Sequence, residues 1–275
     1  MPGMEDFART LPAIETIINY VDPDAPIGGI NDVEREKSTF SLLPYQVAVR
    51  DMRPLAKSLS LDTTGFVLVE RPSRVTDFYD QKQVEDIYLP EIQALIRDLT
   101  GAERVLTFGT IVRNNAPDAP AITHKSVHNA HIDYNIQTTR VVVDRLLPEA
   151  EKPRYAGGRV MQMNVWRPIV TVESAPLALC DSSTVARADL IHGPIGGKSV
   201  AGPGAAGYNL AYNPNHRWYY APRLRPSEAL VFRLCDSEPA SPQWAAHTSF
   251  ADPTSGPDAA PRQSIEVRTL ALFPN

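Results

Sequence analysis

The stretch Val160-Met161-Gln162-Met163-Asn164-Val165-Trp166-Arg167 has the length and the apolar and aromatic content of a β-strand. Comparable stretches recur through the second half of the chain, separated by connections rich in Pro and Gly. They cover residues 104–113, 175–181, 217–221, 229–235 and 264–273. Helical periodicity after residue 101 is confined to residues 138–147. This run of strands indicates a β-sandwich or jelly roll.

The first 100 residues look different from this core. Residues 45–50 and 65–69 suit strands, whereas residues 77–99 place apolar side chains near a 3.6-residue spacing that Pro90 interrupts. We therefore expect two helical pieces or one kinked helix there. The organisation we predict is one domain over 1–275, with an N-terminal arm and helical decoration in 1–100 and the core in 101–275.

The Gly- and Pro-rich segment from Gly193 to Gly207 lacks the strand–loop–helix context of a phosphate-binding loop. We expect it to be a surface loop, as part of an insertion near 186–210. The net charge of −5 provides no basic stripe for nucleic acid, and no apolar run is long enough to cross a membrane. The start of the chain lacks the pattern of a signal peptide, so we expect a cytoplasmic protein.

Cys180 and Cys235 are the only cysteines, which are too few for a disulfide framework or a thiolate zinc site. We expect both to be reduced thiols. The composition thus favours a small-molecule substrate, without nucleic acid or membrane as partners, and leaves a homodimer open.

His131 and Asp133 form the most informative pair in the sequence. Residues i and i+2 of an extended strand point to the same face, so this imidazole and carboxylate converge on one metal ion. A facial triad needs one more histidine and leaves three positions open for a co-substrate and dioxygen. Either His216, in a turn of Asn and Pro, or His247, after an apolar strand, could supply it. His124 and His128 are expected to lie at the surface or behind the ligands.

Downstream of His247, the stretch Arg262-Gln263-Ser264-Ile265-Glu266-Val267-Arg268 alternates in the manner of a strand. Arg262, Ser264 and Arg268 would present hydrogen-bond donors on one face. An arginine fork and a hydroxyl there could bind a dicarboxylate. The alternative is an edge strand with exposed charges.

Together these residues resemble the AsaB-type hydroxylase/desaturase family, which includes the smaller subunit of the cephamycin methoxylation system and gibberellin desaturase-like proteins. The resemblance covers most of the chain. It rests on Thr64-Gly65-Phe66, Tyr88 with Glu91, Thr100-Gly101-Ala102, His131-Ile132-Asp133-Tyr134, Asn164-Val165-Trp166-Arg167-Pro168, Pro176-Leu177-Ala178-Leu179-Cys180-Asp181, Trp218-Tyr219-Tyr220, Ala246-His247-Thr248 and Ser264-Ile265-Glu266-Val267-Arg268.

The resemblance implies a mainly β fold with flanking helices around a double-stranded β-helix, the jelly-roll core that cupins share. It also implies Fe(II), 2-oxoglutarate and dioxygen in specialised metabolism, with His131, Asp133 and His247 as iron ligands. Arg262 with Ser264 matches the Arg-x-Ser co-substrate clamp, although Arg268 remains a second candidate for that contact. The resemblance is compatible with the hydroxylation, the desaturation or the oxidative cyclisation of a small metabolite.

Four further residues are candidates for substrate binding. Tyr134 adjoins the metal carboxylate, while Asn164, Trp166 and Arg167 could be aimed at the substrate by their strand. A packing role for Trp166 and an internal ion pair for Arg167 are the structural alternatives. Two other functions compete with the oxygenase: a non-catalytic accessory subunit of an oxygenase, and a cupin-like metal hydrolase or isomerase that does not use 2-oxoglutarate.

Overall fold

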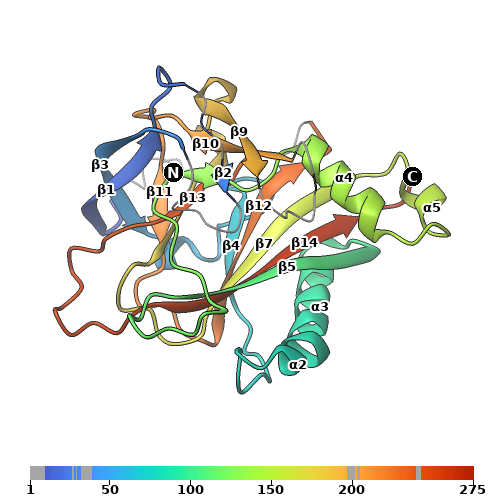
Figure 1. The fold of residues 1–275 in the computed structure, drawn as a ribbon, viewed down its shortest axis with the longest axis horizontal. Helices are drawn as coiled ribbons and strands as arrows, with labels where there is room; N and C mark the ends of the chain where they lie inside the picture. Colours follow the sequence, from blue (N-terminus) through green and yellow to red (C-terminus); the bar gives the residue numbers. More distant parts are fainter. Residues whose placement is uncertain are drawn as a thin grey trace.

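A computed structural model describes residues 10–26, 28, 30–31, 39–196, 202, 205–239 and 243–275. Within these residues the chain forms two β-sheets, with few helices around them (Figure 1). The fold is therefore mainly β with flanking helices, as the sequence predicts.

The smaller sheet has five antiparallel strands and is built from the stretches that the sequence analysis identified. In spatial order they are β4 (Phe66–Glu70), β12 (Glu228–Asp236), β7 (Val160–Pro168), β14 (Gln263–Leu272) and β5 (Arg104–Asn114). Every residue of β7 and β12 is buried. Both faces of these strands are covered, which explains why their apolar runs are nearly continuous.

The larger sheet has nine strands and includes the N-terminal part of the chain. In spatial order they are β1 (Ala13–Val21), β3 (Leu42–Asp51), β11 (Trp218–Tyr220), β8 (Leu177–Cys180), β13 (His247–Ser249), β6 (His131–Ile132), β10 (Ala206–Leu210), β9 (Leu190–Gly196) and β2 (Ile30–Asn31). β1 pairs with β3 and β3 pairs with β11 in parallel, so β1 and β3 extend the sheet of the core. The expected arm is in this respect an integral part of the sheet.

The segment 186–210 differs from the expected loop, because β9 and β10 pair with each other across it and Gly193 lies opposite Gly207. Residues 197–201 and 203–204, between the strands, lie outside the described part of the chain. A Cβ atom on Gly207 would come within 2.3 Å of the Asp133 carbonyl oxygen. Glycine is needed there because it lets β10 approach the segment that carries Asp133.

The helical decoration is a continuous segment over residues 81–100, made of α2 (Gln81–Gln83), a π-helical turn (Val84–Tyr88) and α3 (Leu89–Thr100). Asp80 caps its first turn by accepting hydrogen bonds from the Lys82 and Gln83 backbone N–H groups. Pro90 stands at the start of α3, directly after the π-helical turn, where its missing N–H is tolerated. This arrangement explains how the segment continues through Pro90.

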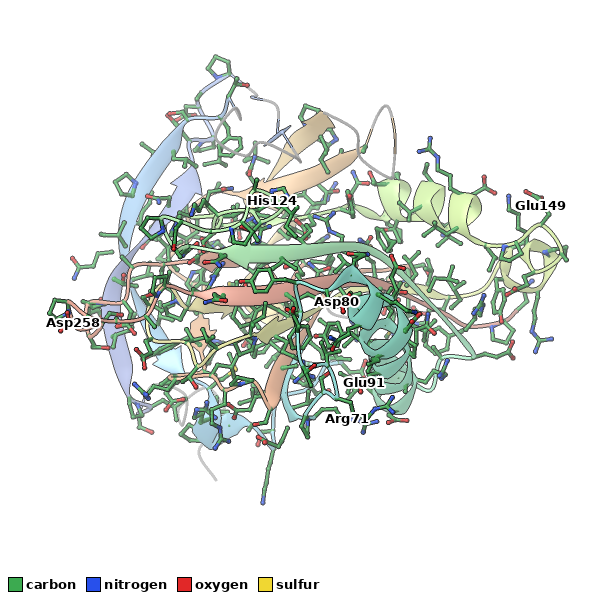
Figure 2. The ribbon with its side chains drawn as sticks, turned by 60° about the horizontal axis from the view of Figure 1, so that its bottom comes forward. Arg71, Asp80, Glu91, His124, Glu149 and Asp258 are labelled. Atoms are coloured by element: carbon green, nitrogen blue, oxygen red, sulfur yellow. The ribbon has the colours of Figure 1, made fainter. Side chains whose placement is uncertain are left out.

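This helical segment packs on the outer face of the smaller sheet, and Figure 2 shows Asp80 and Glu91 on it. Two further helices, α4 (Ile136–Leu146) and α5 (Lys152–Tyr155), lie toward the right edge of both views, where Figure 2 labels Glu149 (Figures 1 and 2). Short 3-10 turns cover Arg53–Leu55, Ser182–Thr184 and Arg187–Asp189. No helix in the described ranges is both long and apolar enough to span a membrane.

The main core lies between the two sheets and combines Trp166 and Phe232 from the smaller sheet with Ile132, Leu179 and Trp218 from the larger one. Trp218 donates its indole N–H to the Tyr20 hydroxyl at 2.7 Å, which satisfies both buried polar groups. Cys180 and Cys235 are buried free thiols, as expected.

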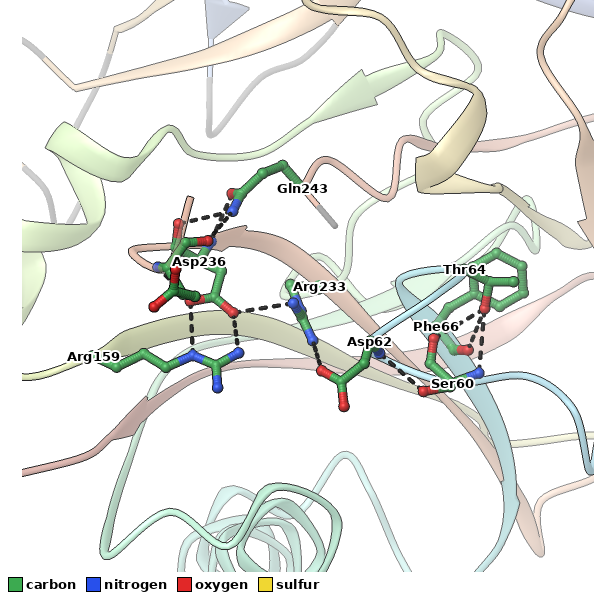
Figure 3. A network of polar contacts seen from close by, with 9 residues as sticks. Ser60, Asp62, Thr64, Phe66, Arg159, Arg233, Asp236 and Gln243 are labelled. Atoms are coloured by element: carbon green, nitrogen blue, oxygen red, sulfur yellow. Dashed lines mark hydrogen bonds and ion pairs between the residues drawn. The ribbon is translucent and has the colours of Figure 1, made fainter. Parts of the chain in front are cut away.

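A charge network around the buried side chains of Arg233 and Asp236 fixes one end of β12 (Figure 3). Arg233 is fully buried and lies 2.9 Å from an Asp62 carboxylate oxygen and 3.0 Å from one of Asp236. Arg159 adds a second guanidinium to Asp236, at 2.6 Å. The Asp236 N–H donates to the Gln243 side chain, and the Ala245 N–H donates to the Arg233 carbonyl. The network therefore anchors the segment that leads into β13.

Candidate metal centre

Strand pairing in the larger sheet brings the proposed ligands together. β6 and β13 are neighbours, and His131 lies directly opposite His247, so both imidazoles project from the same face. Asp133 follows two residues after His131. One donor atom from each of the three side chains lies within 4.8 Å of the other two, and all three residues are buried.

The carboxylate of Asp133 stands between the two imidazoles. His131 Nε2 is 3.6 Å from Asp133 Oδ1, and His247 Nε2 is 3.9 Å from Asp133 Oδ2. The ring centroids of the two histidines are 4.3 Å apart. Two nitrogen donors and one oxygen donor that face a common position from the same side form the arrangement of a facial triad.

Backbone carbonyls orient both imidazoles. His131 Nδ1 lies 2.8 Å from the Asn129 carbonyl oxygen, and His247 Nδ1 lies 3.4 Å from that of Ala245. A carbonyl only accepts hydrogen bonds, so each Nδ1 carries the hydrogen and each Nε2 presents its lone pair to the centre. Asn129 is held in turn, because its side-chain amide donates to Asn209 Oδ1 at 3.0 Å.

Two side chains of the smaller sheet hold the Asp133 carboxylate. Asn164 Nδ2 donates to Oδ2 at 2.8 Å, and a guanidinium nitrogen of Arg268 lies 3.7 Å from Oδ1. Burial raises the pKa of Asp133, but the charge of Arg268, with smaller effects of the two histidines, outweighs it and holds the pKa well below its ordinary value. The group is thus an ionised ligand at neutral pH.

The triad faces a cavity of ≈ 20 Å³, which has room for one ion or water molecule. Its other walls include Arg113, Arg262, Glu266 and Trp166. Two larger surface hollows, of ≈ 380 and ≈ 860 Å³, contain none of the three donors. The small cavity is therefore where the chemistry of these residues converges.

Arg262 and Ser264 leave polar atoms without partners in this region. Arg262 is 2% exposed, donates to the Ala175 carbonyl at 2.8 Å and lies 5.5 Å from the centre of the Trp166 ring. Its Nε and the Ser264 hydroxyl have no hydrogen-bond partner among the residues that the structure describes. Burial, followed by the charge of Arg113, lowers the pKa of Arg262 to about 9. A bound anion would relieve this cost, so the donor set fits a carboxylate.

Arg268 is placed differently from Arg262. Besides facing Asp133, it donates to the Tyr134 hydroxyl at 3.2 Å and lies 5.0 Å from the centre of that ring. The structure thus separates the two candidates for the clamp: Arg262 lines the cavity, whereas Arg268 holds the metal carboxylate. Tyr134 packs against Phe108 and is not among the residues that line the cavity, which corrects the expectation of a pocket wall.

The three candidates on β7 lie on two different faces. Asn164 contacts Asp133 and Trp166 lines the cavity, but Arg167 points to the helix side of the sheet. There it donates to the Tyr88 hydroxyl and to the carbonyls of Pro226 and Arg71. Neighbouring strand residues face opposite ways, so Arg167 cannot share the side of Trp166. The prediction that Arg167 binds substrate is therefore wrong.

His216 lies away from the triad. Its side chain is 1% exposed, its Nε2 is 3.1 Å from an Asp189 oxygen, and its ring stacks on Tyr20. It is not part of the group of residues that could hold a metal ion, which makes His247 the candidate for the third donor.

The sequence analysis missed Arg113 and Glu266 as cavity residues. Glu266 could have been found, because it has the same parity as Ser264 in the alternating stretch. Arg113 could not, since its position depends on the pairing of β5 with β14, about which the sequence is silent.

Solved structures support the same fold. The iron and alpha-ketoglutarate-dependent endoperoxidase NvfI superposes with a TM-score of 0.81 at 27% sequence identity, over 96% of this chain and 99% of that one. A tryptophan-to-phenylalanine variant of the same enzyme gives a TM-score of 0.82. These neighbours are Fe/2-oxoglutarate oxygenases, which have a jelly-roll core, and the predicted jelly roll is thereby confirmed.

Sequence comparisons agree with this result. The chain is 30% identical over 274 residues to the alpha-ketoglutarate-dependent dioxygenase phiK of a fungal species, covering 94% of this chain and 96% of that protein. It is 29% identical to the hydroxylase/desaturase efuI of Hormonema carpetanum, with 95% and 96% covered. The model of the family described as "Oxidoreductase/YMDC permease-like domain" matches residues 18–272. The chain therefore belongs to this oxidoreductase family and is homologous, over nearly its full length, to alpha-ketoglutarate-dependent dioxygenases.

Proposed function

We propose that this protein is an Fe(II)/2-oxoglutarate-dependent dioxygenase that oxidises a small specialised metabolite, with His131, Asp133 and His247 as the iron ligands. The observation that carries the proposal is one cavity that combines this triad with a buried, incompletely satisfied Arg262. A metal hydrolase would use the triad alone. The unsatisfied donors of Arg262 and Ser264 favour the dicarboxylate-dependent oxygenase instead.

The charges of the cavity walls fit a metal ion and a dianion together. Arg113 and Arg262 contribute two positive charges, and Asp133 and Glu266 contribute two negative ones. The formal charges of these four side chains therefore sum to zero. A divalent metal with doubly charged 2-oxoglutarate preserves this balance, whereas either one alone leaves two uncompensated buried charges. The cavity is small, so entry of the co-substrate requires its walls to move apart.

When bound, iron and 2-oxoglutarate supply the oxidising chemistry with dioxygen. The chain supplies orientation. The Asn129 and Ala245 carbonyls aim the two Nε2 atoms, and Asn164 with Arg268 keeps the Asp133 carboxylate ionised and turned to the same point. Arg262 and Ser264 would receive the distal carboxylate of 2-oxoglutarate, and Trp166 shields that contact from water.

The reaction catalysed is hydroxylation, desaturation or oxidative cyclisation, according to which substrate hydrogen is presented to the metal. Relatives named as hydroxylase/desaturase and as endoperoxidase show that this fold supports more than one such outcome. Trp166, which lines the cavity, remains the proposed substrate-side residue, whereas Asn164, also a candidate from the sequence, acts through Asp133.

An anaerobic titration tests the function. Addition of Fe(II) and 2-oxoglutarate to the purified protein should produce a weak visible charge-transfer band, and air should then yield succinate, with most of it formed when a true substrate is present. His131→Ala should abolish both signals. His216→Ala, which alters a buried histidine outside the triad, should retain them.

Two results would contradict the proposal. No band and no succinate from the wild-type protein would favour the accessory subunit or the hydrolase. Loss of metal binding in His216→Ala, with His247→Ala unaffected, would overturn the ligand assignment.

The same proposal includes the remaining expectations on assembly and location. Two buried free thiols are typical of a reducing compartment, which supports a cytoplasmic location. The net charge of −5 supports the expectation that the protein does not bind nucleic acid. Light scattering of the purified protein will distinguish the homodimer from a monomer.

A further inference from the structure

A second arginine belongs to the region of Arg262. Arg113 lies near the end of β5, directly opposite Ser264 of β14. Cross-strand partners in an antiparallel pair project from the same face, about 5 Å apart at Cβ. The side chains of Ile265 and Val267 pack in the core beneath the helices, so Ser264 and Arg113 project to the opposite face. On that face, Arg113 lines the cavity.

Arg113 affects the electrostatics of this region more strongly than the nearby carboxylate does. After burial, the charge of Arg113 is the largest influence that lowers the pKa of Arg262, and it outweighs the opposing effect of Glu266. Arg262 is buried and Arg113 is partly exposed, and their mutual repulsion favours an anion bound between them. Unsatisfied donors on Arg262 and Ser264 mark the place where such an anion would bind.

The Arg113 side chain is also held in position. One guanidinium nitrogen donates to the Lys125 carbonyl at 2.8 Å, and the backbone of Arg113 forms a bridge with His124. An arginine has five N–H donors in a fixed fork, so it can bind this carbonyl and a carboxylate at the same time. Such anchoring lowers the entropic cost of binding a ligand.

We propose that Arg113 is a second guanidinium for the distal carboxylate of 2-oxoglutarate, which it binds together with Arg262 and Ser264. This inference rests on the proposed function and adds a specificity determinant to it. Two arginines and a hydroxyl at one end of the site select a 2-oxo acid that carries a second carboxylate. A 2-oxo acid without that group gains nothing from them.

Calorimetric titration of protein loaded with Mn(II), which prevents turnover, tests this role. The two probes are 2-oxoglutarate and 2-oxobutyrate, which has the same chelating end but lacks the distal carboxylate. Arg113→Gln should weaken 2-oxoglutarate binding about tenfold and leave 2-oxobutyrate affinity within about twofold of the wild type. Arg71→Gln removes an arginine charge from an exposed pair with Asp98 and should change neither affinity.

Each outcome decides the matter. Unchanged 2-oxoglutarate affinity in Arg113→Gln, or an equal loss for both probes, overturns the role of Arg113 while the proposed function stands. A wild-type protein that binds neither probe overturns the proposed function, and this inference with it. Arg113→Met keeps the apolar stem of the side chain, carries the same expectation and replaces the glutamine variant if that one fails to fold.

Discussion

Asn164 is a buried side chain that contacts the proposed metal ligand Asp133 and would support the metal site without touching the ion. Its amide N–H₂ donates to Asp133 at 2.8 Å from the facing sheet, and its Oδ1 is buried without a hydrogen-bond partner in the described part of the chain. An unsatisfied buried acceptor costs stability, so its retention points to function. We infer that Asn164 fixes the rotation of the metal carboxylate.

The variant Asn164→Ala should reduce Fe(II) affinity about 10- to 100-fold, the usual effect of losing a partner that orients a ligand. A competition titration against a metal-binding dye measures this directly. Asn213→Ala removes a comparable hydrogen bond to a carboxylate, that of Asp189, away from the triad, and it should leave the metal affinity intact. Equal affinities in all three proteins would show that Asn164 only fills space.

At the scale of the strand, the sequence predicted the long elements well and the short ones badly. β7, β12 and β14 contain nine or ten residues each, enough for their apolar content to be recognised. β6 and β13 contain two and three residues, which is too short for any periodicity. These two strands carry His131 and His247, so the site had to be inferred from the ligand types and the family resemblance.

The remaining errors have physical causes of the same kind. Glycine and proline in β9 and at the start of β10 indicated a loop, because the sequence cannot show the close approach that makes Gly207 necessary. Arg167 was assigned to the substrate side because adjacent residues were considered together, although strand alternation separates it from Trp166. Arg113 was missed because strand pairing places it beside Ser264, and that pairing depends on the whole sheet and cannot be read from a single stretch of sequence.

The face of β7 that carries Arg167 allows a second prediction. Arg167→Met should destabilise the fold by about 2–3 kcal/mol, because the carbonyls of Pro226 and Arg71 lose a buried donor. Iron affinity should not change, since the triad lies on the other face of the sheet. Urea unfolding and metal titration of the same sample separate the two effects. A loss of iron affinity at unchanged stability would contradict this prediction and show that Arg167 supports the metal site.

At the scale of the molecule, the site depends on how the two sheets are held together, since ligands come from one and their supports from the other. Glu228, at the start of β12, joins the smaller sheet to the 3-10 turn that follows β3 of the larger one. It accepts hydrogen bonds from the Arg53 guanidinium at 2.6 and 3.0 Å and from the Arg225 backbone N–H at 2.8 Å. The Glu228 side chain is 4% exposed and that of Arg53 is 31% exposed, so water screens this pair in part.

This pair predicts how stability changes in acid. Burial raises the pKa of Glu228, but the hydrogen bonds from Arg53 and Arg225 outweigh it and lower the pKa to about 2. A folded-state pKa below the unfolded one gives stability that is complete above the ordinary pKa and is lost as pH falls toward the folded value. Because water partly screens the pair, the contribution is about 1–2 kcal/mol.

Glu228→Gln should therefore be less stable than the wild type by about this amount at pH 7, and the difference should shrink between about pH 4.5 and pH 2. Urea unfolding across that range measures it, and Glu70→Gln, at an exposed pair with Arg225, provides the control with little effect. If the difference between wild type and Glu228→Gln stayed constant as the pH fell, Glu228 would be contributing through packing alone, and the link between the two sheets would not be ionic.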